Sequence, residues 1–559
     1  MAPCSCGAGD GKNMRDAFLF RLFGIVFLLT VTSLSQQSAS PRQNGKDVYQ
    51  SQDKLRSSTR LVVVDVVVSD ARNQPVGGLT ADDFTVLENG VQQKISDFSF
   101  QHPGEAQSQP PRSLPPNVVS NAPAFKSGML NVILFDSVNG EFASQAYAKD
   151  QLVRFFSTAR LDSPVALFAL ESRLRLLQDF TTDTAALKSA IEKYKQTAQA
   201  AQTESFESRE SPFATKGDYH TDERNIETTL NQLNALSKIL AGYPGRKNLI
   251  WLSESFPLDL YPDSVLPAGV SVADVTPVAG IGGKAPGGFQ NMVAGGAFKD
   301  FAAQVKKLAE SMMAAQVAVY PVDAAGVGKN DHLASQHTAN DLAERTGGKA
   351  YHNTNDLSGS MRSGIDDGST YYTLAYYPEN KKWDGQFRVI QIKSSRPGVS
   401  LRYRLGYYAI DPEKTRKEDA DRVTEDFSRS LQVDSPTATS IRFQAGVIPP
   451  ASQTGNKVLV NFAVDPRTLH FNRTEDGMEH ASLSCTVWAY GKDKEKPIMS
   501  HGDTSKADLK PDVYEQMMKQ YYPCKQELEL KPGSYTLKLG VLDRNSNLMG
   551  TTTAQVVVP

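Results

Sequence analysis

The chain has 559 residues, of which 40% are hydrophobic and 22% are charged, and its formal net charge at pH 7 is −2. This length exceeds what one hydrophobic core organises, so the sequence predicts several domains. The near-neutral charge, without a long basic run, excludes the electrostatic footprint of a nucleic-acid-binding protein.

An apolar run near the amino terminus predicts export. Residues 22–34 follow basic residues and precede small residues that suit signal peptidase. Because the run is shorter than a comfortable membrane span, we interpret residues 1–35 as a cleaved signal peptide. The alternative is an uncleaved anchor, which would be the protein's link to a membrane, and translation starts at Met1 or at Met14. The protein is therefore expected to be secreted or to lie in the periplasm or cell envelope.

Changes in composition along the chain predict the domain boundaries. Alternating valines and the Asn89-Gly90 turn indicate β structure early in the chain, and proline clusters indicate linkers. The predicted organisation after the signal peptide is a disordered stalk (36–59), a small β module (60–101), a linker (102–127), an α/β domain (128–368), a β-strand extension (369–410), a charged linker with a solvated helix (411–435) and a β-sandwich (436–559).

The α/β domain is predicted from apolar runs that alternate with amphipathic helices. Such alternation favours a mostly parallel sheet with helices on both faces, because parallel neighbours need a crossover and a helix supplies it. Ligands of such sheets bind at the carboxyl ends of the strands. The buried strands are expected at Met129 to Phe135, Pro164 to Leu170, Asn248 to Leu252 and Gln316 to Val322.

Asp136 follows the first of these strands and is followed by Ser137-Val138-Asn139-Gly140. Several phrases accompany it, including "GLTADDFTVLENGVQQKISDFS", "NVILFDSVNGEFASQAYAKDQLVRFF" and "TYYTLAYYPENKKWDGQFRVIQIK". With these phrases the chain resembles the VWFA-related proteins of acidobacteria from Leu61 to about Ile410. The resemblance implies a Rossmann-like von Willebrand A domain in an exported protein, with recognition and not catalysis as its role.

In the von Willebrand A family, an Asp-x-Ser-x-Ser motif, a threonine and a second aspartate hold a divalent cation. Here Val138 and Gly140 replace the two serines, Arg224 occupies the threonine position, and Glu254 stands near the place of the last aspartate. We therefore expect a degenerate site without a cofactor, in which Arg224 links Asp136 and Glu254 in a charge network. The alternative is a magnesium ion held by an altered set of ligands, namely Asp136, Ser137, Asn139 and Glu254.

Two cysteines remain once the leader is removed, Cys485 and Cys524, and their even number in an exported chain predicts a disulfide. No assembled catalytic motif is evident in the sequence, so we expect no enzyme activity; a hydrolase with a site assembled from distant residues is the alternative. The leading hypothesis is an exported protein that binds another protein, without metal, through a rim built by Asp136, Ser137, Asn139, Arg224 and Glu254. Metal-dependent adhesion is the second hypothesis.

Overall fold

The computed structural model describes residues 61–102, 114–123, 129–195, 217–256, 302–327, 333–411, 420–450, 457–474, 477–494 and 496–559. The predicted signal peptide and stalk lie outside these residues. Among the helices of the described ranges, none has the length and apolar character needed to cross a membrane. These helices are α3 (Phe142–Thr158), α4 (Thr184–Lys193), α5 (Gly217–Leu240), α8 (Ala302–Ala314), α9 (Leu333–Thr346), α10 (Leu357–Asp367), α12 (Ala420–Ser430) and α13 (Pro511–Met517).

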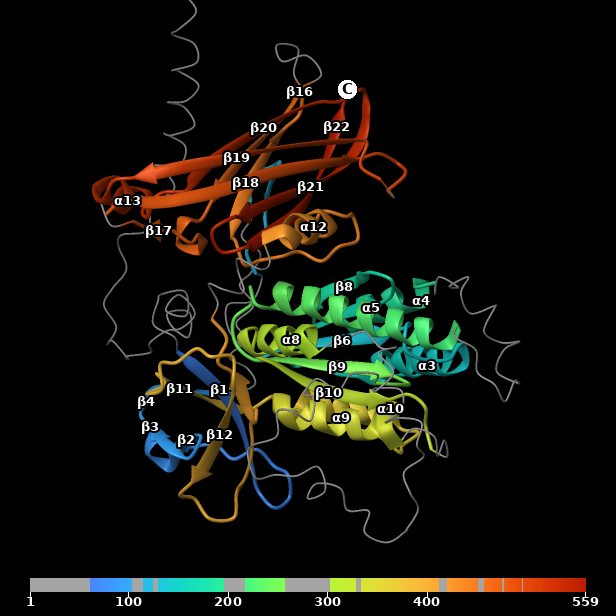
Figure 1. Cartoon of the computed structure of the whole chain (residues 1–559). Coiled ribbons are helices and arrows are strands. Elements are labelled where there is room, and N and C mark those ends of the chain that lie inside the picture. The colour runs from blue at the N-terminus through green and yellow to red at the C-terminus, as the bar shows by residue number, and fades with distance from the viewer. Residues whose placement is uncertain are drawn as a thin grey trace, which may run out of the picture. The chain divides into compact units, whose positions relative to one another are not determined.

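A five-stranded sheet forms the centre of the α/β domain, in the order β10-β9-β6-β7-β8 (Figure 1). The first four strands in this order are parallel, and β8 pairs antiparallel with β7 at the edge. Every residue of β6, β7, β9 and β10 is buried, as expected for a parallel sheet covered on both faces. The strands are β6 (Leu130–Asp136), β7 (Val165–Leu170), β8 (Leu174–Thr181), β9 (Lys247–Ser253) and β10 (Val317–Asp323).

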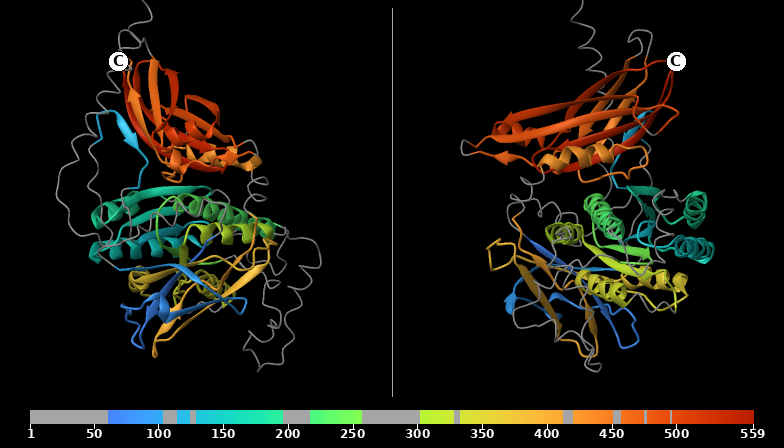
Figure 2. Two further views of the ribbon diagram at one scale, coloured as in Figure 1. Left: turned by 90° about the vertical axis from the view of Figure 1, so that its left-hand side faces the viewer. Right: turned by 45° about the vertical axis from the view of Figure 1, so that its right-hand side comes forward.

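Helices cover both faces of this sheet, because alternate residues of each strand point to opposite sides. On one face the apolar side chains of the sheet share a cluster with those of α5, α8 and α9. On the other face they share a cluster with those of α3, α4 and α10. Figure 2 shows the sheet between its helical layers from two further directions. The predicted α/β architecture is therefore present, and the four predicted buried strands are β6, β7, β9 and β10.

The predicted β module and the predicted strand extension are parts of the same two sheets. The sheets have the orders β13-β1-β11-β4 and β14-β12-β2-β3, so each of them combines strands from before and after the α/β segment (Figure 1). Their separation into two units was wrong, because each segment alone leaves an apolar face that the other covers. The strands are β1 (Val62–Ser69), β2 (Phe84–Glu88), β3 (Val91–Gln93), β4 (Ile95–Gln101), β11 (Tyr371–Tyr376), β12 (Phe387–Ser394), β13 (Ser400–Arg402) and β14 (Gly406–Tyr408). A short 3-10 helix, η1 (Ala81–Asp83), precedes β2.

A buried ion pair joins the two segments of this β module. Arg388 on β12 and Glu88 on β2 are 2% and 3% exposed, and an N–H of Arg388 donates to the Glu88 carboxylate at 3.0 Å. The hydroxyls of Tyr376 and Tyr407 donate to the other carboxylate oxygen at 2.8 and 2.9 Å. The guanidinium also lies 5.4 Å from the ring centre of Trp383. Both charges are thus compensated, which a buried pair requires.

Replacing one partner of this pair is expected to destabilise the fold strongly. Arg388→Met leaves the Glu88 carboxylate buried without its cation, which should cost about 3–5 kcal/mol of unfolding free energy in urea titration. The control is Arg429→Met in α12, where the arginine is 53% exposed and pairs with exposed Glu425; its cost should stay below about 0.5 kcal/mol. Equal losses in the two variants would contradict the assigned role of the buried pair.

The carboxyl-terminal region has two sheets whose inner side chains share one apolar cluster. One sheet has the order β20-β16-β15-β5, and the other has the order β17-β18-β21-β22 with β19 also paired to β18. The strands are β5 (Val118–Ser120), β15 (Phe443–Ile448), β16 (Lys457–Val464), β17 (Asn472–Arg473), β18 (Glu479–Tyr490), β19 (Met499–Leu509), β20 (Tyr522–Glu529), β21 (Gly533–Asp543) and β22 (Leu548–Val558). The 3-10 helix η4 (Pro466–Thr468) lies between β16 and β17.

Two predicted linkers take part in this region. Strand β5 lies within the segment predicted as the linker 102–127 and pairs antiparallel with β15. Helix α12 lies within the segment predicted as a solvated linker, yet it buries Val423 and Phe427 in a cluster with Leu431 and Leu542. Both linker predictions were therefore wrong in part. The proline-rich and charged composition of the two segments suggested linkers, although each segment contains a short apolar stretch that packs against a sheet.

Lys247, the first residue of β9, is a buried lysine held by backbone carbonyls. It is 1% exposed, and its ammonium donates to the carbonyls of Tyr243 and Gly245, both at 2.7 Å, in the turn after α5. Burial lowers the pKa of Lys247 to about 7, and the charge of Asp65 acts in the opposite direction.

The lowered pKa of Lys247 predicts a pH-dependent stability. Between pH 7 and about 10.4 the unfolded chain binds the lysine proton and the folded chain releases it, so the folded state gains stability as the pH rises through this window. Burial lowers the pKa of Lys538 to about 8, so that residue adds to the slope in every variant. Urea titrations at several pH values should show a smaller slope for Lys247→Met than for the wild type. A wild-type slope in Lys247→Met, or the same reduction in the control Lys457→Met at a 54% exposed site, would contradict the assignment.

Candidate functional site

The parallel strands β6, β9 and β10 bring polar residues together at the carboxyl edge of the sheet. We call this edge the carboxyl rim and define it as residues 136–142, 253–255 and 323–327. Asp136, Ser253 and Asp323 end the three strands, and all three are buried. The sequence analysis identified this edge through Asp136 and Glu254, whereas Asp323 was not recognised.

Asp136 is 4% exposed, and its carboxylate accepts five hydrogen bonds. One oxygen accepts from the backbone N–H groups of Val138 at 2.9 Å and of Asn139 at 3.0 Å. The other oxygen accepts from the Asn139 side-chain amide at 2.9 Å, the Trp251 indole at 3.0 Å and the Ser253 hydroxyl at 2.8 Å. Since an ionised carboxylate offers about four lone-pair positions, these donors use its accepting capacity completely.

The environment of Asp136 acts on its protonation in two directions. Burial raises the pKa of Asp136, and the hydrogen bonds from Asn139, Val138 and Ser253 lower it by a smaller amount. Each donor points its partial positive charge at the carboxylate, which is the compensation that a buried acid needs in place of a cation. Asp136 is thereby a fixed connection between strands β6 and β9.

Asn139 extends this connection to helix α5. Its amide group donates both to Asp136 and to the hydroxyl of Thr229, at 2.8 Å, and Thr229 is fully buried on α5. The sequence analysis placed Arg224 at this position, but Arg224 is exposed on the same helix. The predicted network with Arg224 between Asp136 and Glu254 was therefore wrong. The sequence signal for Thr229 was its position directly before Leu230, a residue of the apolar face of this helix.

Glu254 and Ser137 also contact the rim backbone. An oxygen of Glu254, a residue 6% exposed, accepts the backbone N–H of Glu141 at 2.5 Å, just before α3 begins. Gly140 allows this approach, because a Cβ there would lie 2.8 Å from the Cβ of Glu254. The hydroxyl of Ser137 donates to the carbonyl of Leu170 at 2.8 Å. The predicted rim residues Asp136, Ser137, Asn139 and Glu254 thus lie together, and each of them bonds to the protein.

The altered ligand set does not fit a magnesium ion. Magnesium requires oxygen ligands in near-octahedral geometry, whereas Asn139 directs its amide nitrogen at Asp136 and Thr229. The indole N–H of Trp251 occupies an Asp136 oxygen and cannot ligate a cation. In the part of the chain that the structure describes, no group of three or more His, Cys, Asp or Glu residues is arranged to hold a metal ion.

Two large apolar side chains are exposed at the carboxyl rim. Phe142, the first residue of α3, is 63% exposed, and Val327, in the turn after β10, is 62% exposed. Strand β9 separates β6 from β10, so the strand ends that carry them lie about 10 Å apart. Asn355 links the two sides, because its side chain accepts the N–H of Val327 at 3.1 Å and its carbonyl accepts the hydroxyl of Tyr147 at 2.7 Å. The rim therefore presents apolar surface on a hydrogen-bonded frame.

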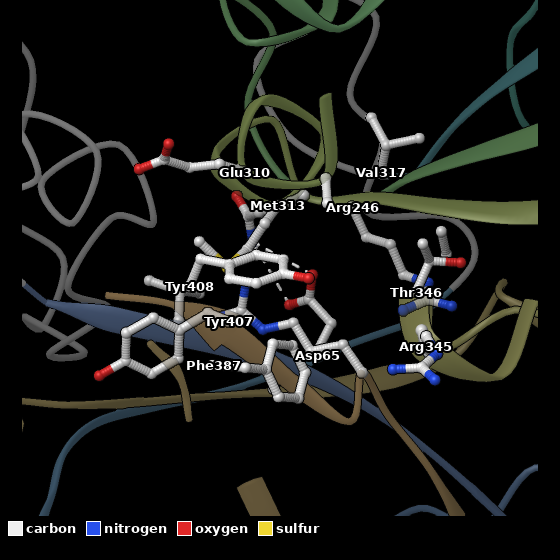
Figure 3. A pocket seen from close by; sticks show the side chains of 16 residues that line it. Asp65, Arg246, Glu310, Met313, Val317, Arg345, Thr346, Phe387, Tyr407 and Tyr408 are labelled. Atoms are coloured by element: carbon white, nitrogen blue, oxygen red, sulfur yellow. Dashed lines mark hydrogen bonds between the residues drawn. The ribbon is translucent and has the colours of Figure 1, made fainter. Parts of the chain in front are cut away.

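A cavity lies at the opposite, amino edge of the sheet. Its lining includes Asp65, Arg246, Arg345 and Tyr407 (Figure 3). Its volume is about 30 Å³, which is room for about two water molecules. Sites for small-molecule substrates are roughly tenfold larger or more. This cavity therefore gives no support to the hydrolase alternative.

A second arrangement that bears on the hydrolase alternative lies between β18 and β19. A ring nitrogen of His480 lies 2.5 Å from Asp508, and its other ring nitrogen lies 3.2 Å from the hydroxyl of Thr474. The side chain of Asp508 is 68% exposed, so water screens its charge. The Thr474 hydroxyl also donates to the carbonyl of Met478 at 3.3 Å, a bond that directs its proton away from the histidine. This arrangement is better explained as a cross-strand pair at a hairpin than as an activated nucleophile.

No family model matches the chain, and no curated protein matches it. Similar solved structures include von Willebrand factor type A from Catenulispora acidiphila, with 10% identity and a TM-score of 0.25 over 61% of this chain and 81% of that chain. An aerotolerance-related membrane protein from Bacteroides fragilis shows 10% identity and a TM-score of 0.23 over 43% of this chain and 99% of that chain. The vWF domain of a type V pilus tip protein from Porphyromonas gingivalis shows 13% identity and a TM-score of 0.23, over 43% of this chain and 94% of that chain. The structures similar to this chain thus include von Willebrand factor type A domains.

Removing the Asp136 carboxylate is expected to destabilise the α/β domain. Asp136→Ala leaves five donors without their acceptor, and buried donors without partners cost about 1–3 kcal/mol each when they cannot relax. Allowing for rearrangement, we expect a loss of about 3–5 kcal/mol in unfolding free energy, measured by urea titration. The control is Asp150→Ala on the exposed side of α3, where the carboxylate is 52% exposed and the loss should be below about 0.5 kcal/mol. Equal losses would contradict the structural role of Asp136.

Proposed function

We propose that this chain is an exported protein that binds another protein through the carboxyl rim, without a metal ion. The observation that carries the proposal is the exposure of Phe142 and Val327 beside a buried acid, Asp136, whose oxygens are already engaged. Export rests on the predicted signal peptide, and a place in the cell envelope or outside the cell follows from it.

The exposed side chains fit an interface better than they fit the fold. Phe142 is the first residue of α3 and is 63% exposed, so it adds little to the core. A polar residue at this position would serve the fold as well. Aromatic residues are enriched at the centres of protein interfaces, where truncating one that is a hot spot costs 2 kcal/mol or more of binding free energy. Because α3 and the turn at Val327 are held by hydrogen bonds to Asn355, little ordering would oppose association.

The chemistry of the rim supports metal-independent binding. In a metal-dependent mode, a carboxylate of the partner completes the coordination of a cation. Here the donors around Asp136 neutralise it from inside the domain, so a partner meets apolar side chains and backbone. An acidic partner residue would find no cation at this position.

The test is retention of a partner by the immobilised full chain from the envelope and extracellular fractions of the producing cells. Phe142→Asp with Val327→Asp should weaken retention at least ~30-fold, as expected for the loss of 2 kcal/mol or more. The wild type should retain the partner equally well in the presence of a chelator.

A matched control is Val557→Asp, which introduces the same charge at a 65% exposed valine on β22. It should retain the partner as the wild type does. Retention that survives the double rim substitution would place binding elsewhere on the chain. Retention that is lost in the chelator would instead support the metal-dependent alternative.

A further inference from the structure

The two cysteines of the carboxyl-terminal region come from different sheets. Cys485 lies in β18, between its partners Asp503 on β19 and Val541 on β21. Cys524 lies in β20 and pairs with Phe462 of the other sheet. Cys485 belongs to the apolar cluster that the two sheets share, and the partly buried Cys524 packs against it. A bond between them would therefore join the sheets across their common core.

The strands that carry the two thiols lie close to each other. Each cysteine is a free thiol, and residues of β18 approach residues of β20 between the two sheets. The disulfide predicted from the sequence stays a prediction, but the fold brings together two residues that stand 39 positions apart in the sequence. A disulfide can form without backbone movement only when the two cysteines lie close together with their side chains facing each other.

The two thiols differ in accessibility. Cys485 is fully buried, whereas Cys524 is partly exposed. A reagent in solution therefore meets Cys524 first, and Cys485 is reached only through Cys524. We therefore call Cys524 the entry thiol, which meets the reagent first, and Cys485 the resolving thiol, which then attacks Cys524.

The electrostatics of the pair point in the same direction. Burial raises the pKa of Cys485, and its hydrogen bond to Cys524 adds to the increase. The same hydrogen bond lowers the pKa of Cys524, and the side-chain amide of Gln526, 4.0 Å from the sulfur, helps to lower it. Asp503 acts against the thiolate at both positions. Of the two thiols, Cys524 is therefore the one that loses its proton more readily and becomes the nucleophile.

We propose that Cys524 and Cys485 are an oxidisable pair, in which Cys524 reacts first with a disulfide oxidant and Cys485 then closes a bond between the two sheets. The Cys524 thiolate attacks one sulfur of the oxidant, a mixed disulfide forms, and the first thiolate leaves. Cys485, after losing its proton to the leaving thiolate or to water, attacks the Cys524 sulfur and releases the second thiol. Two protein thiols are oxidised and one oxidant disulfide is reduced to two thiols. This proposal is independent of the proposed binding function.

Trapping each step with oxidised glutathione tests the order of reaction on the folded full chain. Wild type should end with a mass lower by two hydrogens and without bound glutathione. Cys485→Ala removes the resolving thiol, so it should keep one glutathione on Cys524. Cys524→Ala removes the entry thiol, and its Cys485 should stay unmodified until denaturant is added. Intact-mass and peptide mass spectrometry separate these products.

Wild-type alkylation provides a readout that does not depend on the folding of the variants. With limiting iodoacetamide on the reduced native chain, Cys524 should be labelled at least tenfold faster than Cys485. Oxidised wild type should also unfold at a Tm roughly 10 °C higher than reduced wild type, because the bond restricts the unfolded chain.

Three results would overturn the proposal. One is a wild-type chain that keeps both thiols after prolonged exposure to oxidised glutathione. Another is a stable glutathione adduct on wild-type Cys524, which would show that Cys485 does not resolve it. The third is equal labelling of the two cysteines in the native chain.

Discussion

The carboxylate of Asp136 is the interaction on which the carboxyl rim depends. Its five donors come from the turn after β6 and from β9. Through Asn139 the same network reaches Thr229 on α5. A single buried acid thus fixes two strands and a helix at the edge where parallel α/β sheets place their ligand chemistry. Hydrogen-bond donors supply here the positive potential that a cation would supply elsewhere, so groups of the protein itself compensate the buried Asp136 carboxylate.

The hydrogen bonds of the carboxyl rim also fix the position of an exposed side chain. Phe142 begins α3 directly after the Asp136 turn, and the backbone N–H before it is bonded to Glu254. Its position is therefore set by the same bonds that satisfy the buried acids. At the opposite edge of the sheet, Lys247 and Arg246 are buried, and the backbone N–H of Arg246 donates to the hydroxyl of Tyr371 in the β module at 3.1 Å. Polar groups at the two edges of the sheet thus have different roles. Those at the carboxyl rim fix an exposed surface, and those at the amino edge contact the β module.

The sequence predicted those elements whose pattern reflects their own surroundings. Strands β6, β7, β9 and β10 are buried on both faces, so each reads as a continuous apolar run. The Asn89-Gly90 turn was predicted because both residues adopt positive φ, 47° and 83°, which few other residues tolerate. Strand β19 was missed because it is largely exposed, and β5 was missed because it is three residues long within a proline-rich segment.

The site residues were predictable only in part, for a related reason. Asp136, Ser137, Asn139 and Glu254 lie at strand ends and follow from local pattern. Trp251 and Thr229 read as core and helix residues in the sequence, and their polar groups acquire a role only when folding brings them to Asp136. Arg224 was chosen by position in a motif, but α5 begins earlier than expected and turns this residue to solvent. Whether such residues join the site depends on contacts between residues that are distant in the sequence.

The most direct test of this account is the electron paramagnetic resonance signal of Mn²⁺ titrated into the full chain at neutral pH, with Asp136→Ala in parallel. Bound Mn²⁺ loses the sharp six-line signal of the hydrated ion, so the signal counts unbound metal. The account predicts that the signal grows with added metal equally for the wild type and for the variant. A saturable loss of about one equivalent in the wild type, absent in Asp136→Ala, would show that the carboxylate binds a cation and would contradict the account.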